Sequence, residues 1–219
     1  MAPGRLVTLA SLGALVIGVV LMFALHVLPP TNEISPIRRT ISEYQLGPGK
    51  WIFDLAVLLV AAGSALAFAA LVRRRLVRPL SAPVVLGALW TLSLLVVVTF
   101  TKTDWTIGPS FGGVIHRYAS VVGFVALPLA VLLVARTVFR AAPGWRLLTQ
   151  GLGLISLSGL GLLLVGVARM AAGGGPWWRF VPLGLVERTM ATTAVAAIVV
   201  VMLGVLVRAK SGDAVPVPA

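Results

Sequence analysis

The 219 residues include no cysteine. This absence excludes disulfide bonds, thiolate metal ligands and palmitoylation of cysteine. Acidic residues are also scarce, with six Asp and Glu against 18 Lys and Arg. Charged residues make up 11% of the chain, whereas about a quarter of the residues in an ordinary soluble domain are charged. This composition excludes a soluble globular protein.

Apolar residues dominate the rest of the sequence. Hydrophobic residues make up 59% of the chain, and the mean hydropathy is +1.05. A helix needs about 20 apolar residues to span a bilayer, and no segment alternates like a barrel strand. We therefore predict an all-α, multi-pass membrane protein whose six transmembrane helices form one bundle within residues 1–210. The expected helices are residues 6–28, 51–72, 84–100, 114–135, 147–168 and 185–207.

Basic residues in the connections predict the orientation, because Lys and Arg favour the cytoplasmic side of a membrane. Ten of them lie beside the termini and in the second and fourth connections. Eight lie on the other side, and two of these, Arg117 and Arg188, fall just inside helices. We therefore expect both termini in the cytoplasm. The tail at residues 211–219 is short and polar or proline-containing, so we expect it to be disordered.

The formal net charge of +12 does not indicate a nucleic-acid-binding protein. The basic residues are spread over the connections and are not interleaved with aromatic residues in a soluble domain. Membrane lipids with anionic headgroups are the expected partners of these residues. No motif indicates a protein partner or an oligomeric state.

Five of the six acidic residues and both histidines lie in or beside the first, third and fifth connections. Such groups are costly to bury in a membrane bundle, so their presence is by default a hypothesis of a functional site. These residues lie close to the ends of their helices, and a helix rises only 1.5 Å per residue. They should therefore lie in one layer at one end of the bundle. If the helix faces that carry these residues point into the bundle, the side chains can contact one another. The candidate ligand-binding residues are Glu43, Tyr44, Asp54, Asp104, His116, Arg117, Glu187 and Arg188.

Two chemistries suit this layer. A divalent metal such as zinc, held by His26, Asp104 and His116, would activate water against a lipid ester, amide or phosphate. The catalytic candidates are then Asp104, His116 and Glu187. The alternative is binding without catalysis, in which Arg117 and Arg188 pair with Asp104 and Glu187 or receive an anionic headgroup. No motif of fixed spacing supports catalysis, so the sequence leaves open whether the protein is an enzyme.

Several candidates also have a structural interpretation. Thr40-Ile41-Ser42-Glu43 fits a capping box, in which Glu43 would close the start of a short helix across the end of the bundle. Tyr44 fits the belt of aromatic residues at a membrane interface. His116 and Asp104 are close enough in sequence to form a pair that responds to pH.

The motifs together resemble a known family. Thr40–Tyr44, Gly47–Trp51, Phe100–Asp104, His116 and Gly184–Arg188 are similar in order and placement to the bacterial membrane proteins grouped as domain of unknown function 998. The resemblance covers nearly the whole chain. It implies a six-helix bundle in a bacterial cytoplasmic membrane, with no accepted reaction. The matching positions are Ser42, Glu43, Tyr44, Asp104, His116, Glu187 and Arg188.

These observations predict a protein that binds or handles a lipid or small amphiphile through a polar cluster at the extracytoplasmic end of the bundle. A metal-dependent lipid hydrolase is the first alternative. A structural or regulatory membrane partner protein is the second.

Overall fold

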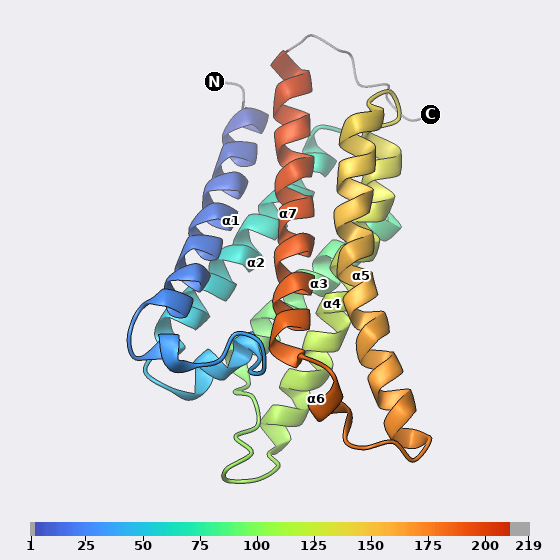
Figure 1. Ribbon diagram of the computed structural model, residues 1–219. Helices are drawn as coiled ribbons and strands as arrows, with labels where there is room; N and C mark the ends of the chain where they lie inside the picture. The colour runs from blue at the N-terminus through green and yellow to red at the C-terminus, as the bar shows by residue number, and fades with distance from the viewer. Residues whose placement is uncertain (1–2, 211–219) are drawn as a thin grey trace.

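The computed structural model describes residues 3–210, and within them the regular structure is entirely helical. Six helices are long and apolar enough to cross a membrane, and they form one bundle (Figure 1). The expected tail at 211–219 lies outside the described residues. The predicted six-helix membrane architecture is confirmed. The long helices are α1 (Pro3–Val27), α2 (Lys50–Arg73), α3 (Ala82–Thr99), α4 (Phe111–Val138), α5 (Pro143–Ala171) and α7 (Leu183–Lys210).

Most observed helices begin before the expected apolar segment. Helix α5 starts at Pro143 and α4 at Phe111, because a first turn that contains Pro, Gly or Arg lowers the local hydropathy without preventing a helix. Pro143 occupies the first turn of α5, where no backbone N–H partner is required. Ser110 caps α4, since its hydroxyl accepts a hydrogen bond from the Gly113 amide at 3.1 Å.

Close contact between helices depends on small residues, since lipid gives apolar helices little drive to associate. A Cβ atom on Gly63 would lie 2.8 Å from the Leu15 side chain, so only glycine lets α1 and α2 approach here. The Ser11 hydroxyl donates to the Gly63 carbonyl at 2.7 Å across the same contact. Further along, the Trp90 indole of α3 donates to the Ser64 hydroxyl at 3.0 Å. These contacts fix α1, α2 and α3 side by side.

The first, third and fifth connections lie at one end of the bundle, which we call the capped end. It lies opposite the start of α1 and the end of α7 (Figure 1). The first connection contains two 3-10 helices, η1 (Thr31–Glu33) and η2 (Ile41–Leu46), and the fifth contains the short helix α6 (Trp177–Phe180). The short helix expected in the first connection is therefore present as η2. Its residues Tyr44 and Gln45 are buried, so η2 packs into the end of the bundle.

Candidate functional site

Gln45 attaches η2 to the end of α3. Its side chain is buried, and its Nε2 donates to the Val97 carbonyl at 2.9 Å while its Oε1 accepts from the Lys102 amide at 3.0 Å. The last carbonyls of a helix have no partner within the helix. Gln45 therefore caps α3 from another connection. No local motif links Gln45 to α3, so this residue was not predicted from the sequence.

Tyr44 is buried beside Gln45, with 1% of its surface exposed. It packs in an apolar cluster with Leu25 and Phe53, and its ring centroid lies 5.3 Å from that of His26 in an edge-on arrangement. The interpretation of Tyr44 as an interface aromatic is wrong, because η2 turns the ring into the bundle. The buried Tyr44 hydroxyl has no hydrogen-bond partner among the described residues.

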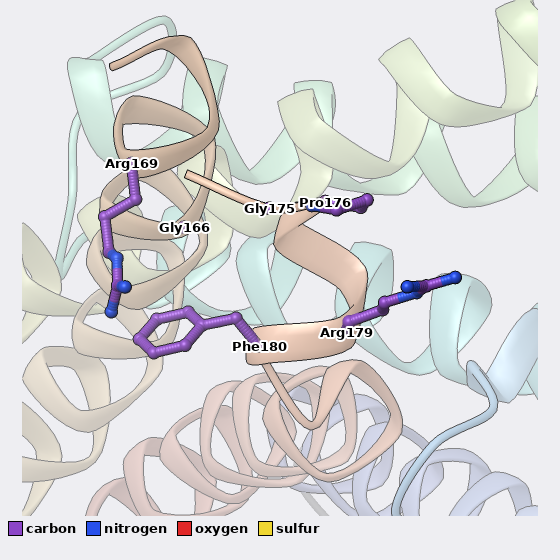
Figure 2. Close-up of a pocket in the computed structure, with 6 residues that line it drawn as sticks. All are labelled: Gly166, Arg169, Gly175, Pro176, Arg179 and Phe180. Carbon is purple, nitrogen blue, oxygen red and sulfur yellow. The ribbon is translucent and has the colours of Figure 1, made fainter. Parts of the chain in front are cut away.

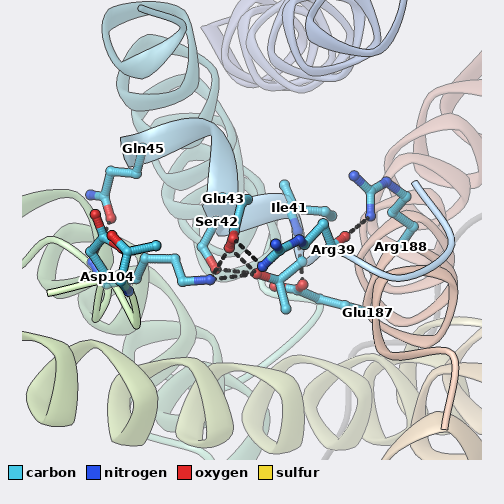
Figure 3. Close-up of polar contacts among 11 residues, drawn as sticks. Arg39, Ile41, Ser42, Glu43, Gln45, Asp104, Glu187 and Arg188 are labelled. Carbon is cyan, nitrogen blue, oxygen red and sulfur yellow. Dashed lines mark hydrogen bonds and ion pairs between the residues drawn. The ribbon is translucent and has the colours of Figure 1, made fainter. Parts of the chain in front are cut away.

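Glu43 joins the first connection to the third. Its carboxylate forms an ion pair with Arg39 Nη1 at 3.1 Å and another with Lys102 Nζ. The predicted capping box is wrong, since the Thr40 side chain makes no capping hydrogen bond. The motif assigned the Glu43 carboxylate to the start of the helix, but this carboxylate pairs with Arg39 and Lys102 instead. Figure 3 shows Glu43 among these contacts.

Glu187 of α7 supplies the acceptor that the start of η2 requires. Its Oε2 accepts a hydrogen bond from the Ile41 amide at 2.8 Å, and the first amides of a helix have no internal partner. Nearby, the Leu185 amide donates to the Ile37 carbonyl at 3.1 Å. The first connection is thus tied directly to the first turn of α7.

Arg188 makes the largest set of contacts at the capped end. Its Nη1 donates to the carbonyls of Arg39 at 2.6 Å and Pro36 at 2.9 Å, and its Nε donates to His26 Nε2 at 2.6 Å. His26 Nδ1 in turn lies 2.8 Å from the Met22 carbonyl, so the His26 ring donates with Nδ1 and accepts with Nε2. The remaining buried atom, Arg188 Nη2, has no partner among residues 3–210.

The predicted ion pairs of Arg117 with Asp104 and of Arg188 with Glu187 do not form within residues 3–210. The Arg117 guanidinium lies over the Trp105 ring, with its Cζ 5.6 Å from the ring centroid. Arg188 instead donates to carbonyl groups of the first connection. Their expected position in one layer suggested these pairs, but Arg117 and Arg188 contact other groups.

His116 and Asp104 do not form the expected pair. His116 Nδ1 bonds to the Phe100 carbonyl at 2.8 Å and closes the end of α3, while its buried Nε2 has no partner in the described chain. Asp104 accepts from the hydroxyl and the amide of Thr106, at 2.7 and 2.9 Å. These two hydrogen bonds hold the pKa of the Asp104 carboxyl below its usual value, because they stabilise the charged form.

The predicted metal ligands are not brought together. His26 bonds to Arg188, His116 bonds to Phe100, and Asp104 forms a local turn. No three His, Asp or Glu side chains within residues 3–210 are placed to hold a metal ion. Asp54 also stands apart, in an ion pair with Lys50 at 2.6 Å. The candidates that the structure does gather are Glu43, Tyr44, Glu187, Arg188 and His26, which with Arg39 and Lys102 we call the polar cluster.

Comparison with known proteins assigns the chain to a family. A family model described as "Protein of unknown function (DUF998)" matches residues 9–204. The chain belongs to this family. The match includes the first, third and fifth connections, and it confirms the resemblance inferred from the sequence motifs. No curated protein and no solved structure matches the chain.

This DUF998 protein also has an open pocket at the capped end, formed by the last turn of α5 and by the fifth connection (Figure 2). Its volume is about 270 Å³. From the sequence, its two arginines counted only as loop charges. The clustering of Arg179 with aromatic residues in Trp177–Phe180 was the one available signal. The lining residues are Gly166, Arg169, Gly175, Pro176, Arg179 and Phe180.

Proposed function

We propose that this membrane protein binds a lipid or a small amphiphile at the capped end, beneath the first connection. One observation carries the proposal. Four buried polar atoms at this end have no hydrogen-bond partner among the described residues. Besides Asp54 Oδ1, whose other carboxylate oxygen pairs with Lys50, they are the Tyr44 hydroxyl, His116 Nε2 and Arg188 Nη2. A buried polar group without a partner costs about 1–3 kcal/mol. A polar headgroup would supply the missing partners.

The surroundings of these atoms favour an amphiphile over a fully polar ligand. The Tyr44 ring packs against Leu25, Phe53 and Val97, so a ligand that reaches the hydroxyl meets apolar surface as well. Arg188 lies close to the same ring, with its Cζ 5.9 Å from the ring centroid. An acceptor on the headgroup would therefore meet the guanidinium and the hydroxyl together, while an alkyl part would contact the apolar cluster.

The two glutamates and the lysine of the polar cluster have a different task in this proposal. Glu43, Glu187 and Lys102 already have partners within the protein, and those partners fix the first connection in place. The connection thus acts as a cover whose attachment is separate from ligand recognition. With both termini in the cytoplasm, as the basic residues predict, the covered site would face the outer leaflet of a bacterial cytoplasmic membrane.

Tyr44→Phe tests this proposal, because it removes only an unpartnered hydroxyl. The free energy of unfolding of the lipid-stripped protein should rise by up to about 1 kcal/mol, since a buried polar group without a partner is lost. The amount of co-purified lipid should fall several-fold. Thermal unfolding in detergent measures the first effect, and mass spectrometry of extracted lipid measures the second.

The chain provides a matched control in Tyr118, its only other tyrosine, whose side chain is exposed on α4. Tyr118→Phe should change neither measurement. If Tyr44→Phe instead destabilised the protein and left lipid retention unchanged, the hydroxyl would be a structural group and the proposal would be wrong.

A further inference from the structure

The pocket between α5 and α6 is a second place where the described chain is open to a ligand. It shares no residue with the polar cluster, and its lining brings two arginines to opposite edges of one cavity of about 270 Å³. We propose that this pocket binds the anionic phosphate headgroup of a membrane lipid. The site is separate from the one under the first connection, so a test of either leaves the other standing.

The charge of the pocket favours an anion. Arg169 and Arg179 line it, and no acidic residue does. Neither arginine forms an ion pair within the part of the chain that the structure describes. A guanidinium presents planar N–H donors that match the oxygens of a phosphate. Arg169 therefore offers donors to an anion without first breaking an internal pair, and Arg179 adds positive charge at the opposite edge of the pocket.

The position of Arg169 is fixed by an aromatic neighbour. Its Cζ lies 4.2 Å from the centroid of the Phe180 ring, and Figure 2 shows the two side chains beside each other, with Arg179 at the far side of the α6 turn. A guanidinium that stacks on a ring keeps its in-plane N–H groups free for other acceptors. The contact thus orders the donor before a ligand arrives and reduces the entropy lost on binding.

The depth of the pocket fits a lipid headgroup. Arg169 lies in the last turn of the membrane-spanning helix α5, and the neighbouring Trp177 and Trp178 are residue types that concentrate at membrane interfaces. The volume is slightly below the roughly 300–1,000 Å³ of pockets for drug-sized ligands. The pocket can therefore hold a headgroup, while the acyl chains remain in the bilayer beside exposed residues of α5 such as Leu162 and Val165.

Two glycines shape the pocket in opposite ways. A Cβ atom on Gly166 would lie 2.9 Å from the Val181 side chain, so glycine here lets the fifth connection approach α5. A Cβ atom on Gly175 would meet nothing within 4 Å. A side chain at Gly175 would consequently occupy the open volume without a clash, which provides a way to fill the pocket and keep its charge.

Native mass spectrometry of the delipidated full chain tests the proposal with phosphatidylglycerol and phosphatidylcholine as probes. Wild-type protein should bind phosphatidylglycerol at least about tenfold more tightly than phosphatidylcholine. This factor is the scale of one charge-assisted hydrogen bond. Arg169→Gln should weaken phosphatidylglycerol binding by about tenfold and reduce the preference. Arg179→Gln, which removes a charge at the edge of the pocket, should weaken this binding by a smaller factor. Gly175→Leu should weaken the binding of both lipids, because it fills the cavity.

Matched controls keep the outcome specific. Arg38→Gln removes one exposed arginine at the same end, and Gly161→Leu adds a side chain where α5 is open. Neither should change lipid binding, and Tyr44→Phe should leave the headgroup preference intact. Equal affinity for the two lipids, or an equal loss in Arg38→Gln and Arg169→Gln, would show that the arginines act only as general surface charge and would overturn the proposal. Displacement of phosphatidylglycerol by an equal concentration of inorganic phosphate would overturn the assignment to a lipid in favour of a free anion.

Discussion

Arg188→Met is expected to lower the free energy of unfolding by about 3 kcal/mol, the largest effect of any single change at the capped end. Three hydrogen bonds from its guanidinium reach Pro36, Arg39 and His26 on other elements. Hydrogen bonds that involve a charged group contribute about 1.5–3 kcal/mol each, and partial exposure reduces that sum here. The methionine retains much of the apolar stem but none of the donors. Thermal unfolding in detergent measures the loss.

Arg117→Met is the matched control for this prediction. Arg117 also lies near the start of a long helix at the capped end, but its described contact is with the Trp105 ring. A partly exposed cation–π contact contributes about 0.5–1 kcal/mol, so its removal should cost at most about 1 kcal/mol. Equal losses in the two variants would contradict the assignment of Arg188 as the main attachment of the first connection.

Gln45→Leu is expected to lower the free energy of unfolding by about 2–3 kcal/mol. The leucine fills a similar volume but leaves the Val97 carbonyl and the Lys102 amide without their side-chain partner. Buried backbone groups that lose a partner cost about 1–3 kcal/mol each, and local relaxation recovers part of the loss. Chemical unfolding monitored by circular dichroism measures the change.

Gln150, the only other glutamine, gives the comparison. It is partly buried in α5, away from the capped end, and Gln150→Leu should change the free energy of unfolding by less than about 0.5 kcal/mol, as is usual away from buried polar contacts. A loss in Gln45→Leu no larger than in Gln150→Leu would mean that η2 does not depend on the cap that Gln45 gives to α3.

The fold was accessible from the sequence because each membrane span leaves a long apolar signal. A run of about 20 apolar residues has few alternatives to a membrane helix, so all six helices could be placed. The end of the bundle that carries most acidic residues and both histidines followed from the alternation of the connections. Helix starts such as Pro143 and Phe111 were missed, because the hydropathy of a segment records its apolar length and not its hydrogen-bonded first turn.

The pairing of side chains could not be predicted in the same way. Glu43 fitted a local capping box, yet Lys102 from another connection binds its carboxylate and Glu187 from α7 accepts from the start of η2. Such contacts depend on how each helix is rotated about its axis. In a chain that is apolar on nearly every face, the sequence pattern does not determine that rotation. Only the Asp104 turn was readable locally, since Asp side chains often bond to the backbone two residues further on.

The polar cluster therefore separates into two kinds of group. The first connection is held on the bundle by Arg188 Nη1 and Nε, the Glu187 side chain and the Glu43 carboxylate. The Tyr44 hydroxyl and Arg188 Nη2 have no partner within residues 3–210 and are the groups to which we assign ligand recognition. One arginine thus contributes to both tasks, through different nitrogen atoms.

Hydrogen–deuterium exchange of residues 41–46 in the intact, detergent-solubilised protein tests the central claim most directly. If η2 is fixed to α3 and α7, its amides, including that of Ile41, should exchange at least about 100-fold more slowly than in a free peptide, since exchange then requires an opening that costs a few kcal/mol. Exchange as fast as in the free peptide would contradict the account, because the first connection would then not be held on the bundle.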